Sequence, residues 1–200
     1  MKPLFHFLIA AFLLVFSHLS LAVTGPREVI ENATGGVTVE LIKLTQAERT
    51  DAKIRELVLK YIIPAVDEQR VAMGALGKYW RTATPEQRQA FIELYRELQI
   101  RTYSGAFKAF NGEKFAVEEV VLNDEGDKAI VKGNLKQADG KLIPIQFRLY
   151  QRDKNSPWLT YDAVVAGLSM VKTYRDQLSE KLQNISMDEL LQELSQKNTP

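Results

Sequence analysis

The stretch Ala129–Tyr150, AIVKGNLKQADGKLIPIQFRLY, decides the fold. Apolar residues alternate with mainly polar ones on both sides of its Asp139-Gly140 pair: Ala129, Val131 and Leu135 precede it, and Ile143, Ile145, Phe147 and Leu149 follow it. An alternation of period two is typical of half-buried strands, and Asp-Gly between two such runs is a strong hairpin signal. The stretch therefore predicts an antiparallel hairpin with one apolar face.

The same alternation extends on both sides of this hairpin, from Glu113 to Val165. Phe115 and Val117 continue the pattern upstream, and a further run ends near Val165. Turn-forming residues separate the runs, at Asn123-Asp124-Glu125-Gly126 and again over 153–157. We therefore expect a twisted four-stranded antiparallel meander.

A helical pattern precedes this sheet, from Pro26 to Phe110. One stripe ends or kinks at Pro64 and consists of Ile54, Leu57, Val58, Tyr61 and Ile62. Thr84-Pro85-Glu86-Gln87 combines an N-cap, a proline at the first helical position and a capping-box glutamine, so a long helix should run from there to about Phe110. Its many apolar residues indicate burial on two sides. Two interpretations stay open: a central core helix, or a helix that lines a ligand cavity.

Helices also follow the sheet, since a stripe resumes after Gly167 and Ser186-Met187-Asp188-Glu189 forms a second capping box. Helices on both sides of a sheet, with no linker between them, predict one α+β domain over 23–200. Gly35-Gly36, followed by β-branched Val37, Thr38 and Val39, opposes a helix at the start, so we expect a broken helix there.

The first 22 residues are typical of a cleaved secretory signal. Lys2 is their only charged residue, the run from Leu4 to Phe16 is almost entirely apolar, and Ser20-Leu21-Ala22 is a small-x-small cleavage site. We therefore expect a soluble, exported chain, with an uncleaved membrane anchor as the alternative. Both histidines lie in this segment and the chain has no cysteine. The mature chain would then lack the usual general base at neutral pH, the commonest metal ligand and any thiol nucleophile.

The charge of the chain argues against a nucleic-acid partner. Removing Lys2 from the 26 Lys and Arg leaves 25, against 25 Asp and Glu, and the two signs are interleaved. A nucleic-acid-binding protein normally shows a basic excess.

No glycine-rich phosphate loop or nucleophile elbow is present, and we expect no catalytic residue, no metal and no cofactor. One constellation permits an enzyme hypothesis, Tyr161-Asp162 with Tyr150. A carboxylate and a phenol facing an apolar pocket transfer protons in ketosteroid isomerase. Adjacent strand residues point to opposite faces, however, so Tyr161 and Asp162 share a cavity only if a bulge intervenes. Asp162 is better suited to bracing a neighbouring element.

Three blocks together resemble a known family. They are Leu76–Arg88 (LGKYWRTATPEQR), Phe91 through Tyr103-Ser104-Gly105-Ala106, and Trp158 through Tyr161-Asp162 with the segment from Gly167 to Arg175. In this combination and order the chain resembles the MlaC family, also called the toluene-tolerance or Ttg2 family, over roughly Arg49 to Leu194. It departs from the family pattern at Gly35-Gly36.

The resemblance implies a periplasmic phospholipid carrier with an NTF2-like helix-and-curved-sheet arrangement. Its implied partners are a phospholipid ligand, an outer-membrane lipoprotein–porin complex and an inner-membrane ABC transporter with its MCE-domain subunit, in a system that maintains outer-membrane lipid asymmetry. A pocket between the apolar face of the sheet and the long helix would hold the acyl chains. The inward-facing residues predicted to contact them are Leu76, Trp80, Leu94, Leu98, Phe107, Val117, Val131, Ile145, Phe147, Tyr161 and Leu168. The alternatives are an NTF2-like small-molecule-binding or ketosteroid-isomerase-like domain, and an interaction module with a filled core.

Overall fold

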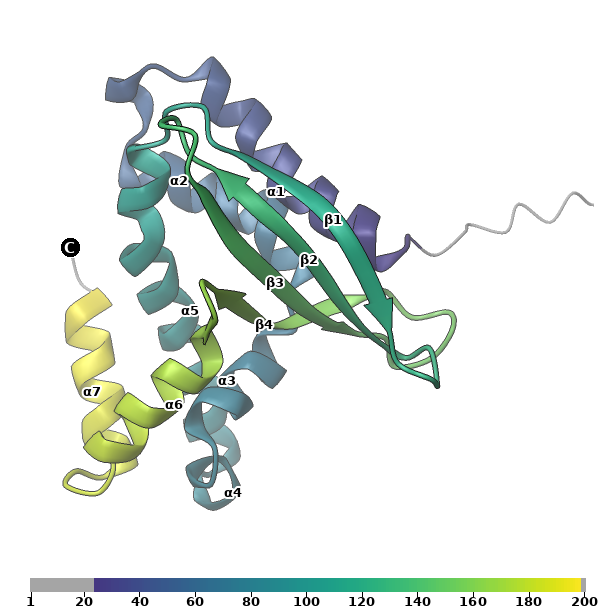
Figure 1. Ribbon diagram of the computed structural model, residues 1–200. Coiled ribbons are helices and arrows are strands. Elements are labelled where there is room, and N and C mark those ends of the chain that lie inside the picture. The colour runs from purple at the N-terminus through teal and green to yellow at the C-terminus, as the bar shows by residue number, and fades with distance from the viewer. Residues whose placement is uncertain (1–23, 199–200) are drawn as a thin grey trace, which may run out of the picture.

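The computed structural model describes residues 24–198, as helices arranged around one curved sheet (Figure 1). The helical segments that precede the sheet are α1 (Pro26–Lys43), η1 (Gln46–Glu48), α2 (Asp51–Leu57), η2 (Val58–Ile62), η3 (Ile63–Ala65), α3 (Glu68–Leu76), α4 (Tyr79–Thr82) and α5 (Pro85–Lys108). The sheet contains β1 (Lys114–Leu122), β2 (Lys128–Lys136), β3 (Leu142–Tyr150), β4 (Leu159–Val165) and β5 (Leu168–Ser169). The last helices are α6 (Met170–Lys181) and α7 (Met187–Asn198). The predicted cleavage site after Ala22 lies outside the described residues.

The predicted meander is confirmed. The strands are antiparallel in the order β1-β2-β3-β4-β5, and the fifth is a two-residue addition that the alternation did not show. At the Asp139-Gly140 turn, Gly140 has a φ of 87° and Gln137 N–H donates to Lys141 O at 2.8 Å. Only glycine adopts that backbone conformation at little cost, so the turn residue sets the register of the hairpin.

The long helix α5 begins where the capping box predicts. The Thr84 hydroxyl accepts from Gln87 N–H, and the Gln87 side chain accepts from Thr84 N–H at 3.0 Å. Phe91 and Tyr95 on its first half are fully buried, and their rings stack at 5.2 Å. The helix is thus a core helix at this end.

The expected break at Gly35-Gly36 is wrong, because α1 is continuous through both glycines. A Cβ on Gly36 would lie 2.3 Å from Cδ1 of Tyr61, whereas nothing lies within 4 Å of one on Gly35. Gly36 therefore lets the Tyr61 ring lie directly against the helix backbone. The packing of Tyr61 against α1 offsets the poor helix propensity of this stretch.

The stripe from Ile54 to Ile62 is helical but not regular. α2 continues into the π-helix η2 and then the 3₁₀ turn η3, which contains Pro64. Val66 next to η3 forms an isolated parallel bridge with Thr160 of β4. This irregular segment thereby joins the N-terminal helices to the edge of the sheet.

The buried apolar residues form three clusters. The helical cluster joins α3, α5, α6 and α7 and includes Ala72, Leu76, Phe91 and Leu190. The N-terminal cluster consists of Val37, Leu41, Ile54, Leu57, Val58 and Ile100. The sheet cluster consists of Ile30, Ala129, Val131, Leu149 and Trp158. α1 contributes to the last two, and it lies along one face of the sheet in Figure 1.

Candidate functional site

The face of the sheet that α1 covers is apolar. The register places Val131 opposite Phe147, and Gly133 opposite both Val117 and Ile145. A Cβ on Gly133 would lie 2.7 Å from Cζ of Phe115, so this glycine lets the Phe115 ring lie across the strand. That ring reaches Phe147, edge to face, at 5.4 Å.

Half-buried apolar side chains pack on the N-terminal and sheet clusters, and we call them together the seam. α1 contributes buried residues to both clusters, Val37 and Leu41 to the first and Ile30 to the second. The seam consists of Leu59, Tyr61, Ile62, Ile63, Phe107 and Phe110 on the helical side, and Val29, Phe115, Val117, Val120 and Phe147 on the sheet side.

A cleft opens at one end of the seam. It has a volume of about 350 Å³ and is lined by Thr24, Val29, Asn32, Ala33, Lys60, Tyr61, Pro64, Ala65, Pro157 and Trp158. We call it the α1 cleft, because α1 forms one wall, η2 and η3 form the second, and the segment before β4 forms the third. Tyr61 belongs to the border of the N-terminal cluster and Trp158 to the sheet cluster. The cleft is therefore an open part of the boundary that the seam follows.

The predicted acyl-contact residues do not gather in one cavity. Four of them belong to the helical cluster or pack on it: Leu76, Trp80, Leu94 and Leu98. Phe107, Val117 and Phe147 are in the seam, Val131 is fully buried in the sheet cluster, and Ile145 is half-buried on the same face. Tyr161 lies beside Tyr150, and Leu168 is 65% exposed at the turn before α6. Contact of these side chains with lipid stays a prediction.

The expectation that α5 as a whole faces the sheet across a pocket is corrected by this distribution. The first half of α5 packs in the helical cluster, and only its second half, with Ile100 and Phe107, reaches the N-terminal cluster. Near the second half, the Tyr103 hydroxyl donates to Met170 Sδ at 3.4 Å.

The lining of the α1 cleft was missed by the sequence reasoning. A signal existed, because Ile30, Ala33, Val37 and Leu41 are the buried stripe of α1 and are spaced three or four residues apart. The two glycines concealed it. Nothing in the periodicity distinguishes Lys60 or Trp158 as lining residues.

The constellation of Tyr150, Tyr161 and Asp162 has a structural role. The pairing of β3 with β4 skips Tyr161, so a bulge does intervene there. Asp162 is 5% exposed and accepts hydrogen bonds from Ser169 Oγ at 2.7 Å, from Arg148 Nη1 at 3.2 Å and from Val171 N at 3.2 Å. As predicted, it braces a neighbouring element, the start of α6.

The guanidinium of Arg70 lies over the rings of Tyr150 and Tyr161. The Arg70 guanidinium is 3.9 Å from the ring centroid of Tyr150 and 5.2 Å from that of Tyr161. The Tyr150 hydroxyl donates to Asp67, whose other carboxylate oxygen caps α3 through Arg70 N–H. These contacts tie α3 to the sheet.

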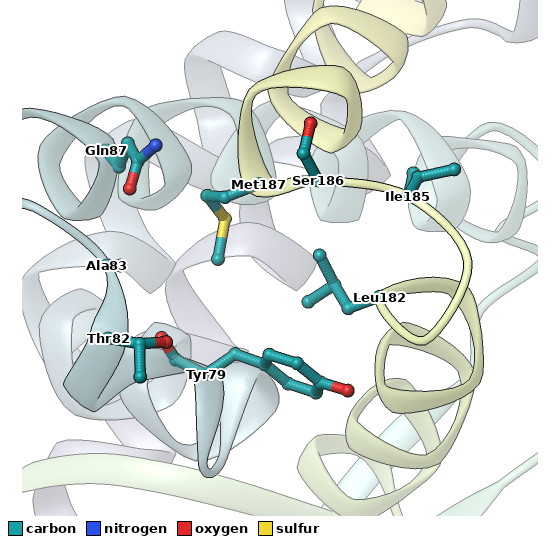
Figure 2. A pocket seen from close by; sticks show the side chains of 8 residues that line it. All are labelled: Tyr79, Thr82, Ala83, Gln87, Leu182, Ile185, Ser186 and Met187. Carbon is teal, nitrogen blue, oxygen red and sulfur yellow. The ribbon is translucent and has the colours of Figure 1, made fainter.

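A smaller cleft of about 210 Å³ lies between the helix ends (Figure 2). Figure 2 shows Tyr79, Leu182 and Met187 around it, and Gln87 at its rim donates to Asp188 at 2.7 Å. Its apolar lining residues Tyr79, Leu182 and Met187 belong to the helical cluster or pack on it, and none of its lining residues is in the seam. Among residues 24–198, no helix is long and apolar enough to cross a membrane, and no group of acidic side chains is arranged to hold a metal ion.

These features define a class: an α+β protein in which helices cover a curved antiparallel sheet and leave the apolar core divided. Comparison with known proteins is consistent with this class. The model of the MlaC protein family matches residues 34–196, and the chain belongs to that family.

Two curated relatives are similar over most of their length. One is the toluene tolerance protein Ttg2D of Pseudomonas putida, 27% identical over 182 residues, which are 88% of this chain and 81% of that protein. The other is the intermembrane phospholipid transport system binding protein MlaC of Haemophilus influenzae, 26% identical over 172 residues, which are 83% of this chain and 78% of that protein. The predicted family is confirmed.

A solved structure has the same fold. It is the phospholipid-binding protein of Ralstonia solanacearum in complex with a phospholipid, with a TM-score of 0.79 and 24% identity. The match covers 88% of this chain and 97% of that one. The α+β arrangement predicted from the sequence is thereby confirmed.

Proposed function

We propose that this protein is a periplasmic phospholipid carrier that holds acyl chains in the seam between α1, η2 and the sheet. The apolar cleft beside α1 carries the proposal, because it opens among half-buried aromatic and aliphatic side chains that pack on the N-terminal and sheet clusters. Membership of the MlaC family and the phospholipid bound by the Ralstonia protein support the same ligand class.

The energetics of a lipid in water explain why a carrier is needed. Burial of one methylene is worth about 0.8 kcal/mol, so a 16-carbon chain in water costs on the order of 12 kcal/mol. Unassisted escape from a membrane is therefore negligible. A protein that offers a comparably apolar site makes the exchange nearly balanced, and neither a catalytic residue nor a cofactor is needed.

The α1 cleft alone is too small to enclose a diacyl lipid. Its volume of about 350 Å³ is at the low end of the 300–1,000 Å³ typical of sites for drug-sized ligands. We propose that the chains separate the side chains of the seam as they enter. A half-buried border separates at lower cost than a close-packed cluster such as that around Val131.

The membrane partners follow from the family. We propose that the protein exchanges lipid with an outer-membrane lipoprotein–porin complex and with an inner-membrane ABC transporter bearing an MCE-domain subunit. This exchange would maintain the lipid asymmetry of the outer membrane. A signal peptide cleaved after Ala22, leaving the domain 23–200, would deliver the chain to the periplasm.

One purification tests the ligand. The mature protein is isolated from the periplasm under non-denaturing conditions, and its organic extract is analysed by mass spectrometry. We expect stoichiometric diacyl phospholipid. An empty protein, or one that carries a steroid-like molecule, contradicts the proposal and favours the NTF2-like small-molecule alternative.

A further inference from the structure

We propose that Lys60 faces the head group of the bound lipid at the α1 cleft and gives the carrier a preference for phospholipids of net negative charge over zwitterionic ones, in which a cation on the same head group offsets the phosphate. This inference rests on the proposed function and goes beyond it, because it assigns one end of the lipid to a named cation. The chains would extend from the cleft into the seam.

The α1 cleft has the polarity of an amphiphile site. Its inner lining is apolar and comes from three elements, with Val29 and Ala33 on α1, Ala65 on η3 and Trp158 before β4. Trp158 is 7% exposed and Ala33 is 6% exposed, so this wall is deep. The polar lining residues Thr24, Asn32 and Lys60 are all exposed. An apolar wall with a polar rim suits a molecule with a long apolar body and a charged end.

Lys60 is the cationic side chain at this rim, and no carboxylate pairs with it. Its Nζ lies 4.9 Å from the ring centroid of Tyr61, and among residues 24–198 it forms no ion pair within 4.0 Å. The nearest acidic side chains are engaged elsewhere, since Glu40 accepts from Lys43 Nζ at 3.1 Å and Glu56 from Lys53 Nζ at 2.9 Å. Like an ordinary lysine, Lys60 is charged at neutral pH, and the contact with Tyr61 raises its pKa further.

The placement of Lys60 depends on the irregular helix. It lies in the π-helix η2, and such insertions are frequent at functional sites. Tyr61, the next residue, is held against α1 by the space at Gly36, and its hydroxyl donates to Glu40 at 3.3 Å. These two contacts hold the Tyr61 ring in place beneath the Lys60 ammonium.

The test measures head-group selection during loading. Protein freed of lipid in detergent is reloaded from vesicles containing equal amounts of phosphatidylcholine and phosphatidylglycerol with matched chains. Bound lipids are then quantified by mass spectrometry. We expect the wild type to enrich phosphatidylglycerol and Lys60→Glu to lower the bound ratio by about five-fold, which corresponds to about 1 kcal/mol between exposed charges. The difference should diminish at about 1 M salt, where the screening length is about 3 Å.

Controls separate the explanations. Lys197→Glu on α7 makes the same charge change at an exposed site outside the cleft and should leave the ratio unchanged. Inorganic phosphate in excess should not displace bound lipid. If phosphate binds at Lys60 but Lys60→Glu leaves the ratio of bound lipids unchanged, the assignment is overturned. An equal loss of selection in both variants would also overturn it. If the wild type loads no phospholipid at all, the proposed function fails; if it loads lipid but Lys60→Glu changes nothing, only this inference fails.

Discussion

At the scale of single residues, Gly35 and Gly36 are neighbours in one helix with opposite constraints. Alanine is favoured over glycine in a helix by about 1 kcal/mol. Gly35→Ala adds a methyl group in open space and should stabilise the protein by about that amount. Gly36→Ala forces the Tyr61 ring away from α1, so it should destabilise the protein despite the better propensity. Denaturant unfolding measures both; equal stabilisation by the two substitutions would show that Tyr61 moves freely.

Substitution of Asp162 tests whether this residue has a structural or a catalytic role. Hydrogen bonds to a charged group contribute about 1.5–3 kcal/mol each, so Asp162→Asn should lower the free energy of unfolding by about 1–3 kcal/mol. Bound phospholipid should be unchanged. Asp176→Asn, which removes an exposed ion pair with Lys172, is the matched control and should cost less than about 1 kcal/mol. A ketosteroid turnover that the wild type shows and Asp162→Asn abolishes would contradict the carrier.

At the scale of elements, α2 and α5 are joined by a charged pair with a defined pH response. Arg55 Nε and Nη2 donate to the two oxygens of Glu97 at 2.9 and 2.8 Å, and this contact lowers the pKa of Glu97. A lowered pKa adds stability above the ordinary glutamate value of about 4.3, and that stability is lost as the pH falls through the pKa of the folded protein. Glu97→Gln should therefore cost about 0.5–1 kcal/mol at pH 7 and much less near pH 3. A cost independent of pH would assign the effect to packing.

Local signals predicted most of these elements. The Asp139-Gly140 hairpin, the Thr84 capping box and the Ser186 capping box each depend on residues within a few positions of one another, and all three form as expected. α1 was misjudged because its buried residues and Gly36 pack against partners that are distant in sequence, such as Ile54, Val131 and Tyr61. The π-helix was not predicted either, because the apolar spacing from Ile54 to Ile62 also fits a regular α-helix.

The candidate site was harder to predict than the fold, for the same reason. Alternation shows that Val131 and Val117 face inward, but not that one is fully buried while the other borders the seam. Likewise, the apolar residues of α5 predicted burial on two sides, while only the structure shows that Leu94 and Phe107 serve different clusters. How the core is divided depends on distant packing partners.

At the scale of the whole molecule, a divided core predicts that two inward-facing valines respond differently to the same change. Val131→Trp overpacks a filled cluster and should cost about 1–3 kcal/mol. Val117→Trp places the ring at the seam, so it should cost less stability but reduce the lipid that co-purifies. Melting temperature and bound lipid are measured on both. A large stability loss from Val117→Trp with unchanged lipid would show that the seam is ordinary core.

Release of the ligand is the property that makes a binder a carrier. A lipid that binds only the folded protein stabilises it by RT ln(1 + [L]/Kd), and the cost of exposing acyl chains makes spontaneous loss very slow. The loaded protein should therefore keep most of a fluorescent phospholipid when it is mixed with bare liposomes. Adding the inner-membrane MCE-domain complex or the outer-membrane complex should accelerate transfer, followed by dequenching, because docking would separate α1 and η2 from the sheet and expose the seam. Transfer that is equally fast with and without either complex would identify a passive lipid binder and contradict the proposed exchange between the two membranes.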